Sequence, residues 1–141
     1  MKLEIKVLRG NILLPSKATN GSAGFDIHWS LPESILTPGS TYNVDLGFAT
    51  SFPENCGAIM LPRSGLGSKH GLKLNNTIGL IDSDYRGEWK AAITVDKPLR
   101  LSPGDRFLQF TMVTVPEMKV TITECLDETE RGSGGFGHTG K

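Results

Sequence analysis

Residues 77–95 read Thr77-Ile78-Gly79-Leu80-Ile81-Asp82-Ser83-Asp84-Tyr85-Arg86-Gly87-Glu88-Trp89-Lys90-Ala91-Ala92-Ile93-Thr94-Val95. Two short apolar runs, 77–81 and 89–95, flank the connection 82–87, which is polar and closes on a glycine. This arrangement is typical of two strands joined by a turn. The segment therefore predicts the two arms of a β-hairpin.

Short alternating runs of the same kind continue on both sides of this segment. No segment longer than a turn or two has the 3.6-residue apolar period of an amphipathic helix. Residues 66–71 are compatible with either a short helix or an irregular loop. Turn-forming residues separate the runs, so the chain is predicted to be an all-β sandwich, jelly roll or barrel, with further strands at 3–7, 25–29, 42–46, 57–61, 107–115 and 119–124.

The composition limits the classes of function. The chain has 141 residues, which fits one domain, and 15 basic residues balance 15 acidic ones. A net charge of zero gives no overall attraction to nucleic acid or to an anionic membrane. No apolar run is long enough to span a bilayer, and the first residues lack the apolar stretch of a secretory signal. Cys56 and Cys125 have no metal-type spacing, and we expect both to be reduced thiols in or near the core of an intracellular protein.

The C-terminal residues differ in kind from the rest. The segment from Arg131 to Gly140 is rich in glycine, so it cannot pack a core and is expected to be mobile when alone. We therefore predict an all-β domain at residues 1–127 and a flexible arm at residues 128–141. Arg131, Phe136 and Thr139 give this arm groups that could wrap a polyphosphate and stack on a base, although many glycine-rich tails have no role.

Two segments before the hairpin contain candidate binding residues. Asp26, between apolar neighbours on a predicted strand, either supports a cation or an arginine or lies at a surface edge. Arg63, Ser64 and Gly65 combine a guanidinium, a hydroxyl and a backbone that an anion can approach closely. The same residues also fit an ordinary turn with a solvated arginine.

The hairpin and the segment 104–109 carry the remaining candidates. Asp82 could act as a general base for water, and the ring of Tyr85 could pack on a sugar. Asp84 and Arg86 are more simply explained as a surface charge pair. Arg106 and Gln109 lie three apart on a predicted strand and should point to opposite faces, so one of them is expected to be structural.

The chain offers no evident all-protein metal site. His28, His70 and His138 have no ligand spacing with one another or with the cysteines, and the acidic residues form no dense cluster. A Mg²⁺ ion bound mainly by the phosphates of a substrate is compatible with this pattern.

Five segments taken together resemble the five motifs of the homotrimeric dUTPase family, the deoxyuridine 5′-triphosphate nucleotidohydrolases, and the bacterial-type members above all. They occur in the family's order and at similar spacing from residue 17 to the end of the chain. The segments are Ala23 to Ile27, Pro62 to Gly65, Gly79 to Gly87, Gly104 to Gln109 and Arg131 to Gly140.

This resemblance implies a jelly-roll-like β-barrel subunit with a mobile arm, in a homotrimer whose three active sites lie at subunit interfaces. The hairpin of one subunit would meet the first, second and fourth motifs of a neighbour and the arm of the third. The implied reaction is Mg²⁺-dependent hydrolysis of dUTP to dUMP and pyrophosphate. It keeps uracil out of DNA and supplies dUMP for thymidylate synthesis in the cytoplasm, or in the host cytoplasm if the chain is viral.

The resemblance also implies a role for each matching residue. Asp82 matches the carboxylate that orients or deprotonates the attacking water, and Tyr85 matches the residue that rejects ribonucleotides. Asp26 and Arg106 match a supporting acid and arginine, and Asp26 is expected to reach the metal only through water, if at all. The remaining matches are substrate-binding: Asn76, Leu80, Ile81 and Lys90 for the base and sugar, Arg63, Ser64, Gly65 and Gln109 for phosphate, Phe136 as a cap on uracil, and Arg131, Gly137, His138 and Thr139 in the arm.

Two residues depart from the family's usual pattern, and two other functions are alternatives to dUTP hydrolysis. Leu108 is bulkier than the alanine common at its position, and His138 stands where many members have serine. The dCTP deaminases share the fold, but they place a catalytic glutamate where this chain has Ala92. A non-catalytic trimer that binds nucleotide or a protein partner is the other alternative, and it would not need a positioned base such as Asp82.

Overall fold

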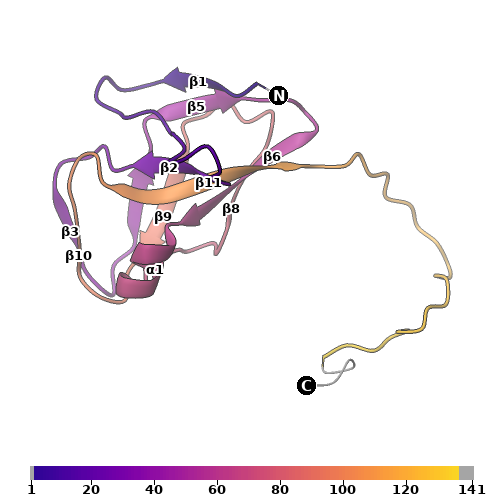
Figure 1. Cartoon of the computed structure of the whole chain (residues 1–141). Helices are drawn as coiled ribbons and strands as arrows, with labels where there is room; N and C mark the ends of the chain where they lie inside the picture. The colour runs from indigo at the N-terminus through magenta and orange to yellow at the C-terminus, as the bar shows by residue number, and fades with distance from the viewer. Residues whose placement is uncertain (1, 137–141) are drawn as a thin grey trace.

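The computed structural model describes residues 2–136. Strands dominate it, and one short helix is present among these residues (Figure 1). Most strands fall on the alternating runs of the sequence, while β3, β5, β7 and β10 were not predicted. In chain order the elements are β1 (Glu4–Val7), β2 (Phe25–His28), β3 (Ser34–Leu36), β4 (Tyr42–Asp45), β5 (Phe48–Ser51), β6 (Cys56–Pro62), α1 (Ser64–His70), β7 (Lys73–Leu74), β8 (Gly79–Ile81), β9 (Lys90–Thr94), β10 (Leu99–Leu101) and β11 (Arg106–Thr114).

The strands form two main sheets and two strand pairs. One sheet has the order β2-β11-β6-β8 and the other the order β4-β9-β7, while β1 pairs with β5 and β3 pairs with β10. These strand pairings are all antiparallel, and most join strands that are distant in sequence. This is the jelly-roll-like all-β architecture that the sequence predicted.

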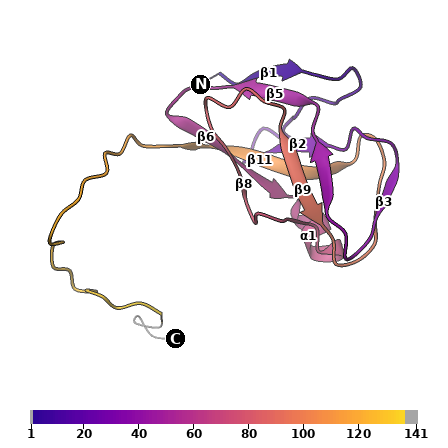
Figure 2. The ribbon, with the colours of Figure 1, turned by 180° about the vertical axis from the view of Figure 1, so that it is seen from behind.

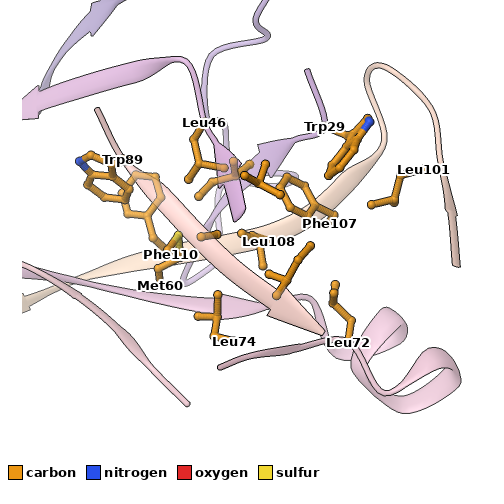
Figure 3. Packing of buried hydrophobic residues seen from close by; sticks show 14 of the residues in the cluster. Trp29, Leu46, Met60, Leu72, Leu74, Trp89, Leu101, Phe107, Leu108 and Phe110 are labelled. Carbon is orange, nitrogen blue, oxygen red and sulfur yellow. The ribbon is translucent and has the colours of Figure 1, made fainter. Parts of the chain in front are cut away.

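The hydrophobic core lies between the sheets (Figure 3). Trp89 is completely buried there, and its ring contacts Phe110 at 5.0 Å and Phe48 at 5.2 Å between centroids. Its indole N–H donates to the hydroxyl of Thr50 at 3.0 Å, so the one polar atom of the ring is satisfied. Leu108, bulkier than the usual residue of its motif, is also fully buried.

The predicted hairpin is wrong in its pairing. Residues 79–81 and 90–94 are both strands and the chain reverses between them, but β8 pairs with β6 and β9 pairs with β4 and β7. The two arms therefore belong to different sheets (Figure 2). Local sequence could predict the strands but not their partners, because strand pairing depends on residues far away in the chain.

Two other expectations are settled by the structure. Residues 64–70 form a helix, which decides the alternative left open at 66–71, and Gly71 ends it in the left-handed region at φ 64°. The strand predicted at 119–124 is absent: this segment is exposed and extends away from the body (Figure 1). Within the described chain, the alternating side chains of this segment have no sheet against which to pack.

The two cysteines differ in their exposure to solvent. Neither Cys56 nor Cys125 forms a disulfide in the described chain, and Cys56 is buried as expected. Cys125 is exposed, so its predicted place near the core is wrong. Within residues 2–136, no helix has the length and apolar character needed to cross a bilayer.

Candidate active site

A pocket of about 650 Å³ lies between the arms that were predicted to pair. The sequence had singled out Asn76, Leu80, Ile81 and Lys90, and all four line it. It had missed several other lining residues, among them Asn43, Asp45 and Asn75. Nothing local marks these three, since they reach the pocket only through the pairing of β4 and β7 with β9.

The pocket is bordered by strand edges. β8 is the last strand of its sheet and pairs with β6 on one side. β7 pairs with β9 only at Ile93 and Thr94, so the edge of β9 at Lys90 and Ala91 continues along the pocket. Backbone N–H and C=O groups alternate along such edges, and they offer donors and acceptors to a flat polar ligand.

An ion pair stands at one side of the pocket. Lys90 Nζ lies 3.2 Å from Asp45 Oδ1, and both residues line the hollow. The two residues face each other directly in the register of β4 and β9. A cross-strand pair of this kind becomes visible only when the register is known.

The connection after β8 holds Asp82 and Tyr85 in a tight turn. Tyr85 N–H donates to the Asp82 carbonyl at 3.2 Å, and the Tyr85 hydroxyl donates to the Glu88 carbonyl at 3.0 Å. A Cβ on Gly87 would collide with the Tyr85 ring, so glycine at this position lets the ring fold over the backbone. Asp82 remains exposed beside the pocket-lining Ile81.

Arg86 does not pair with Asp84 as expected. Its Nη1 donates to the carbonyls of Ser83, at 2.6 Å, and Tyr85, at 3.3 Å. Arg86 therefore stabilises, through these hydrogen bonds, the turn that contains Asp82 and Tyr85.

A second cluster forms around the buried Asp26, which is 6% exposed. Arg63 Nε lies 2.9 Å from one of its carboxylate oxygens, and Arg106 Nη1 lies 3.2 Å from the other. The carboxylate thus holds two guanidinium groups in place, and the pairs offset the cost of its burial. The sequence proposed Asp26 and Arg106 as a supporting acid and arginine, and in the structure these two side chains are in contact.

A β-bulge places both Arg106 and Gln109 beside Asp26, although residues three apart on a regular strand point to opposite faces. The register of β11 against β2 shifts between Arg106 and Leu108, so one extra residue breaks the simple alternation. Gln109 then faces Asp26 across the ladder while Arg106 also reaches it. Gln109 Nε2 donates to the Pro62 carbonyl at 3.2 Å. Both residues therefore belong to the same cluster.

Beside this cluster is a hollow suited to an anion. It measures about 350 Å³, and its lining includes Arg63, Ser64, Gly65, Lys69 and Arg106. A Cβ on Gly65 would meet nothing within 4 Å, so the space above this backbone is open to a ligand. Three cationic side chains and no carboxylate line the hollow, which favours oxyanions.

His28 lies close to the same charges. Its Nδ1 is buried and has no hydrogen-bond partner in the described chain. Burial lowers the pKa of His28, and Arg106 and Arg63 lower it further, while Asp26 acts in the opposite direction. His28 therefore favours the neutral form more than a free histidine does.

The described part of the arm, residues 128–136, reaches neither hollow. Arg131 Nε donates to the Gly134 carbonyl at 3.0 Å, and Phe136 is fully exposed. This segment lies well away from the barrel (Figures 1 and 2). Gly137, His138 and Thr139 lie outside the described residues. Within one chain, the pocket between β8 and β9 and the hollow beside Arg63 share no lining residue.

Among residues 2–136, no three His, Cys, Asp or Glu side chains gather closely enough to hold an ion. Both oxygens of Asp26 already accept from arginines, but each keeps a second lone pair for a water.

Comparison with known proteins agrees with this geometry. The family model described as dUTPase matches residues 11–140. The deoxyuridine 5′-triphosphate nucleotidohydrolase of Acinetobacter baumannii strain AYE is 45% identical, with 100% of this chain and 99% of the relative covered. That of Salmonella enteritidis PT4 is 41% identical, with 99% and 98% covered.

Solved structures show the same fold. A Staphylococcus bacteriophage 80alpha dUTPase with dUPNHPP has a TM-score of 0.87 at 24% identity, and 99% of each chain is covered. A dUTPase from phage phi11 of S. aureus, described with a structural Mg(II) ion, has a TM-score of 0.77 at 22% identity, with 88% of this chain and 97% of that chain covered. On the family match and the full-length relatives, this chain belongs to the dUTPase family.

Proposed function

We propose that this chain hydrolyses dUTP to dUMP and pyrophosphate, with the nucleoside in the pocket between β8 and β9 and the triphosphate on the cluster at the start of α1. The observation that carries this proposal is the pocket bounded by Asn76, Leu80, Ile81 and Lys90 in a chain of this family. The reaction removes dUTP before polymerases can use it and supplies dUMP for thymidylate synthesis.

The strand edges would select uracil. Backbone N–H and C=O groups at Leu80 and Ile81, with the amide of Asn76, offer the pattern that separates uracil from cytosine. Ala92 lines the pocket where a deaminase would need a glutamate. At the position of Ala92 the pocket therefore lacks the carboxylate that a deaminase reaction would need. The walls of the pocket would crowd a 5-methyl group and so exclude thymine.

The ring of Tyr85 would pack against the deoxyribose. Its hydroxyl is engaged by Glu88 and its ring is fixed over Gly87, so the ring has little freedom to move aside. A 2′-hydroxyl on the sugar would collide with it, which would exclude UTP.

Arg63, Ser64, Gly65 and Gln109 would bind the phosphates. The guanidinium of Arg63 is already oriented by Asp26, and Arg106 shares the same carboxylate, so neither arginine has to be ordered when substrate binds. Ser64 and Gly65 begin α1, where backbone N–H groups have no partner within the helix.

Asp82 would accept a proton from the attacking water. The water oxygen forms a bond to the α-phosphorus while the bond from that phosphorus to the bridging oxygen breaks. Pyrophosphate then leaves with the electron pair of the broken bond, and dUMP remains. Asp82 is exposed and next to the pocket, so a water can reach it.

A homotrimer would assemble the complete site. The two hollows of one chain share no lining residue, and residues 128–136 of the arm lie away from both. Each site would join the pocket of one subunit, the anion hollow of a second and the arm of a third. The arm would bring Arg131, Gly137, His138 and Thr139 to the phosphates and Phe136 over the uracil.

Mg²⁺ would be the cofactor, and the triphosphate would hold it, with Asp26 reaching it at most through water. When bound, the ion would neutralise charge on the phosphate oxygens. A related phage enzyme is described with a structural Mg(II) ion, which supports a metal in the family. We expect the enzyme to act in the cytoplasm, where dUTP is formed.

The test is pyrophosphate release from dUTP, dCTP, dTTP and UTP, each with Mg²⁺ and with EDTA, alongside ammonia release from dCTP. We expect metal-dependent release from dUTP alone. Tight binding of dUTP without any release would favour the non-catalytic binding module, and ammonia from dCTP would favour a deaminase.

A further inference from the structure

The chain changes from one sheet to the other at the rim of the pocket. Lys73 and Leu74 pair with β9, and Asn75 N–H still donates to the Ala92 carbonyl at 2.9 Å. From Gly79 the chain pairs with β6 instead. Residues 76–78 are thus the corner that separates β8 from β9 and opens the space between them.

Thr77 forms this corner in a strained conformation. Its φ is 68°, and within residues 2–136 it is the one residue other than glycine with a positive φ. Ile78 N–H donates to the Asn76 carbonyl at 2.7 Å, which closes a three-residue turn around Thr77. Such a γ-turn with positive φ is rare, and a β-branched residue resists this backbone region strongly.

The strain is not explained by packing of the side chain. Thr77 is exposed, while its N–H donates to the Leu74 carbonyl at 2.9 Å. Backbone hydrogen bonds on both sides of the residue therefore impose the conformation. Strained residues of this kind concentrate at binding sites, where the surrounding structure holds them in place.

We propose that Thr77 is a positioning residue for the nucleoside. Its stiff turn fixes Asn76 and the open edge of β8 at the distance from β9 that a base requires, before the substrate arrives. Rigid preorganisation of this kind removes the cost of ordering the loop on binding. This role rests on the proposed function of the pocket, which both Asn76 and Gly79 line.

The test compares two variants at this position with the parent and a control. Thr77→Gly accepts the positive φ without strain but lets the corner move. Thr77→Val keeps the β-branch and replaces the hydroxyl with a methyl group. Lys97→Gly introduces glycine at an exposed position outside the pocket lining and serves as the control. The measurements are KM and kcat for dUTP, the Kd of dUMP by calorimetry, and the midpoint of thermal unfolding.

We expect Thr77→Gly to raise KM and the Kd of dUMP about ten-fold, with kcat and the unfolding midpoint near those of the parent or the midpoint higher. Thr77→Val and Lys97→Gly should keep the parent's KM. An unchanged KM in Thr77→Gly, an equal rise in Thr77→Val, or weaker binding accompanied by a lower unfolding midpoint would each overturn the positioning role. If the parent itself does not hydrolyse dUTP, the proposed function fails, and the dUMP affinities still decide the role of Thr77.

Discussion

Asp82 is the residue on which turnover should depend most directly. Asp82→Asn keeps the shape of the side chain but removes the proton acceptor, so dUTP should still bind while kcat falls by roughly a hundred-fold or more. Steady-state kinetics and calorimetry with dUMP check the two parts separately. Full turnover in this variant would remove Asp82 from the role of base.

Gly87 should control sugar selectivity through Tyr85. In Gly87→Ala the new Cβ would collide with the outer part of the Tyr85 ring, so the ring must move while the exposed turn keeps its fold. The preference for dUTP over UTP should fall about ten-fold, with a stability change within about 0.5 kcal/mol. Gly21→Ala is the matched control, because a Cβ there meets nothing within 4 Å. Equal selectivity in both variants would contradict the role of Tyr85.

His28 should make stability depend on pH. Its pKa in the folded protein is lowered from 6.5, so the unfolded chain binds a proton more readily. Stability from this residue is therefore present above about pH 6.5 and is lost as the pH falls through the folded-state pKa. Unfolding midpoints between about pH 5.5 and 7.5 should fall less steeply on acidification in His28→Gln than in the parent. Parallel curves would show that His28 does not contribute.

At the scale of elements, β11 is the strand that joins core and site. It pairs with both β2 and β6, and its bulge directs Arg106 and Gln109 to Asp26 while Phe107, Leu108 and Phe110 stay fully buried. Core packing on this strand therefore also holds the cluster around Asp26 in place.

Leu108→Ala should consequently destabilise the protein by about 2–5 kcal/mol, because it removes a buried side chain and leaves a cavity. Urea unfolding at a fixed protein concentration measures the loss. Ile35→Ala is the control, since Ile35 is 55% exposed and should cost much less. A loss below about 1 kcal/mol would mean that the strands close around the smaller residue.

At the scale of the whole molecule, the arm should serve catalysis and not folding. Residues 130–136 are largely exposed and lie away from the barrel. Deleting residues 130–141 should leave the unfolding midpoint unchanged and reduce turnover of dUTP at least about ten-fold, because the site loses its cover. A truncated chain that fails to fold would instead make the arm structural.

Mixing tests the shared site directly. Asp82→Asn chains lack the base and truncated chains lack the arm, so each variant alone should be nearly inactive. In the proposed homotrimer, refolding a mixture of the two would give sites with Asp82 from one chain and an arm from another, and turnover should partly return. No recovery from the mixture would contradict an arm supplied by a different subunit.

The sequence by itself determined the all-β class, most of the longer strands, the family and the candidate residues. Alternation and turn residues are local signals, and short motifs such as Pro62 to Gly65 keep their chemistry wherever the chain places them. For the same reason the sequence predicted strands at 77–81 and 89–95, and the structure has strands at 79–81 and 90–94, but the predicted pairing of the two with each other was wrong.

Only the tertiary structure decided which groups meet. The separation of β8 from β9, the bulge in β11, the Asp45–Lys90 pair and the strained corner at Thr77 all arise from pairing between distant segments. Such contacts depend on the register of whole strands, and a local window carries no information about that register. The pocket therefore exists because two neighbouring strands pair with other partners and not with each other.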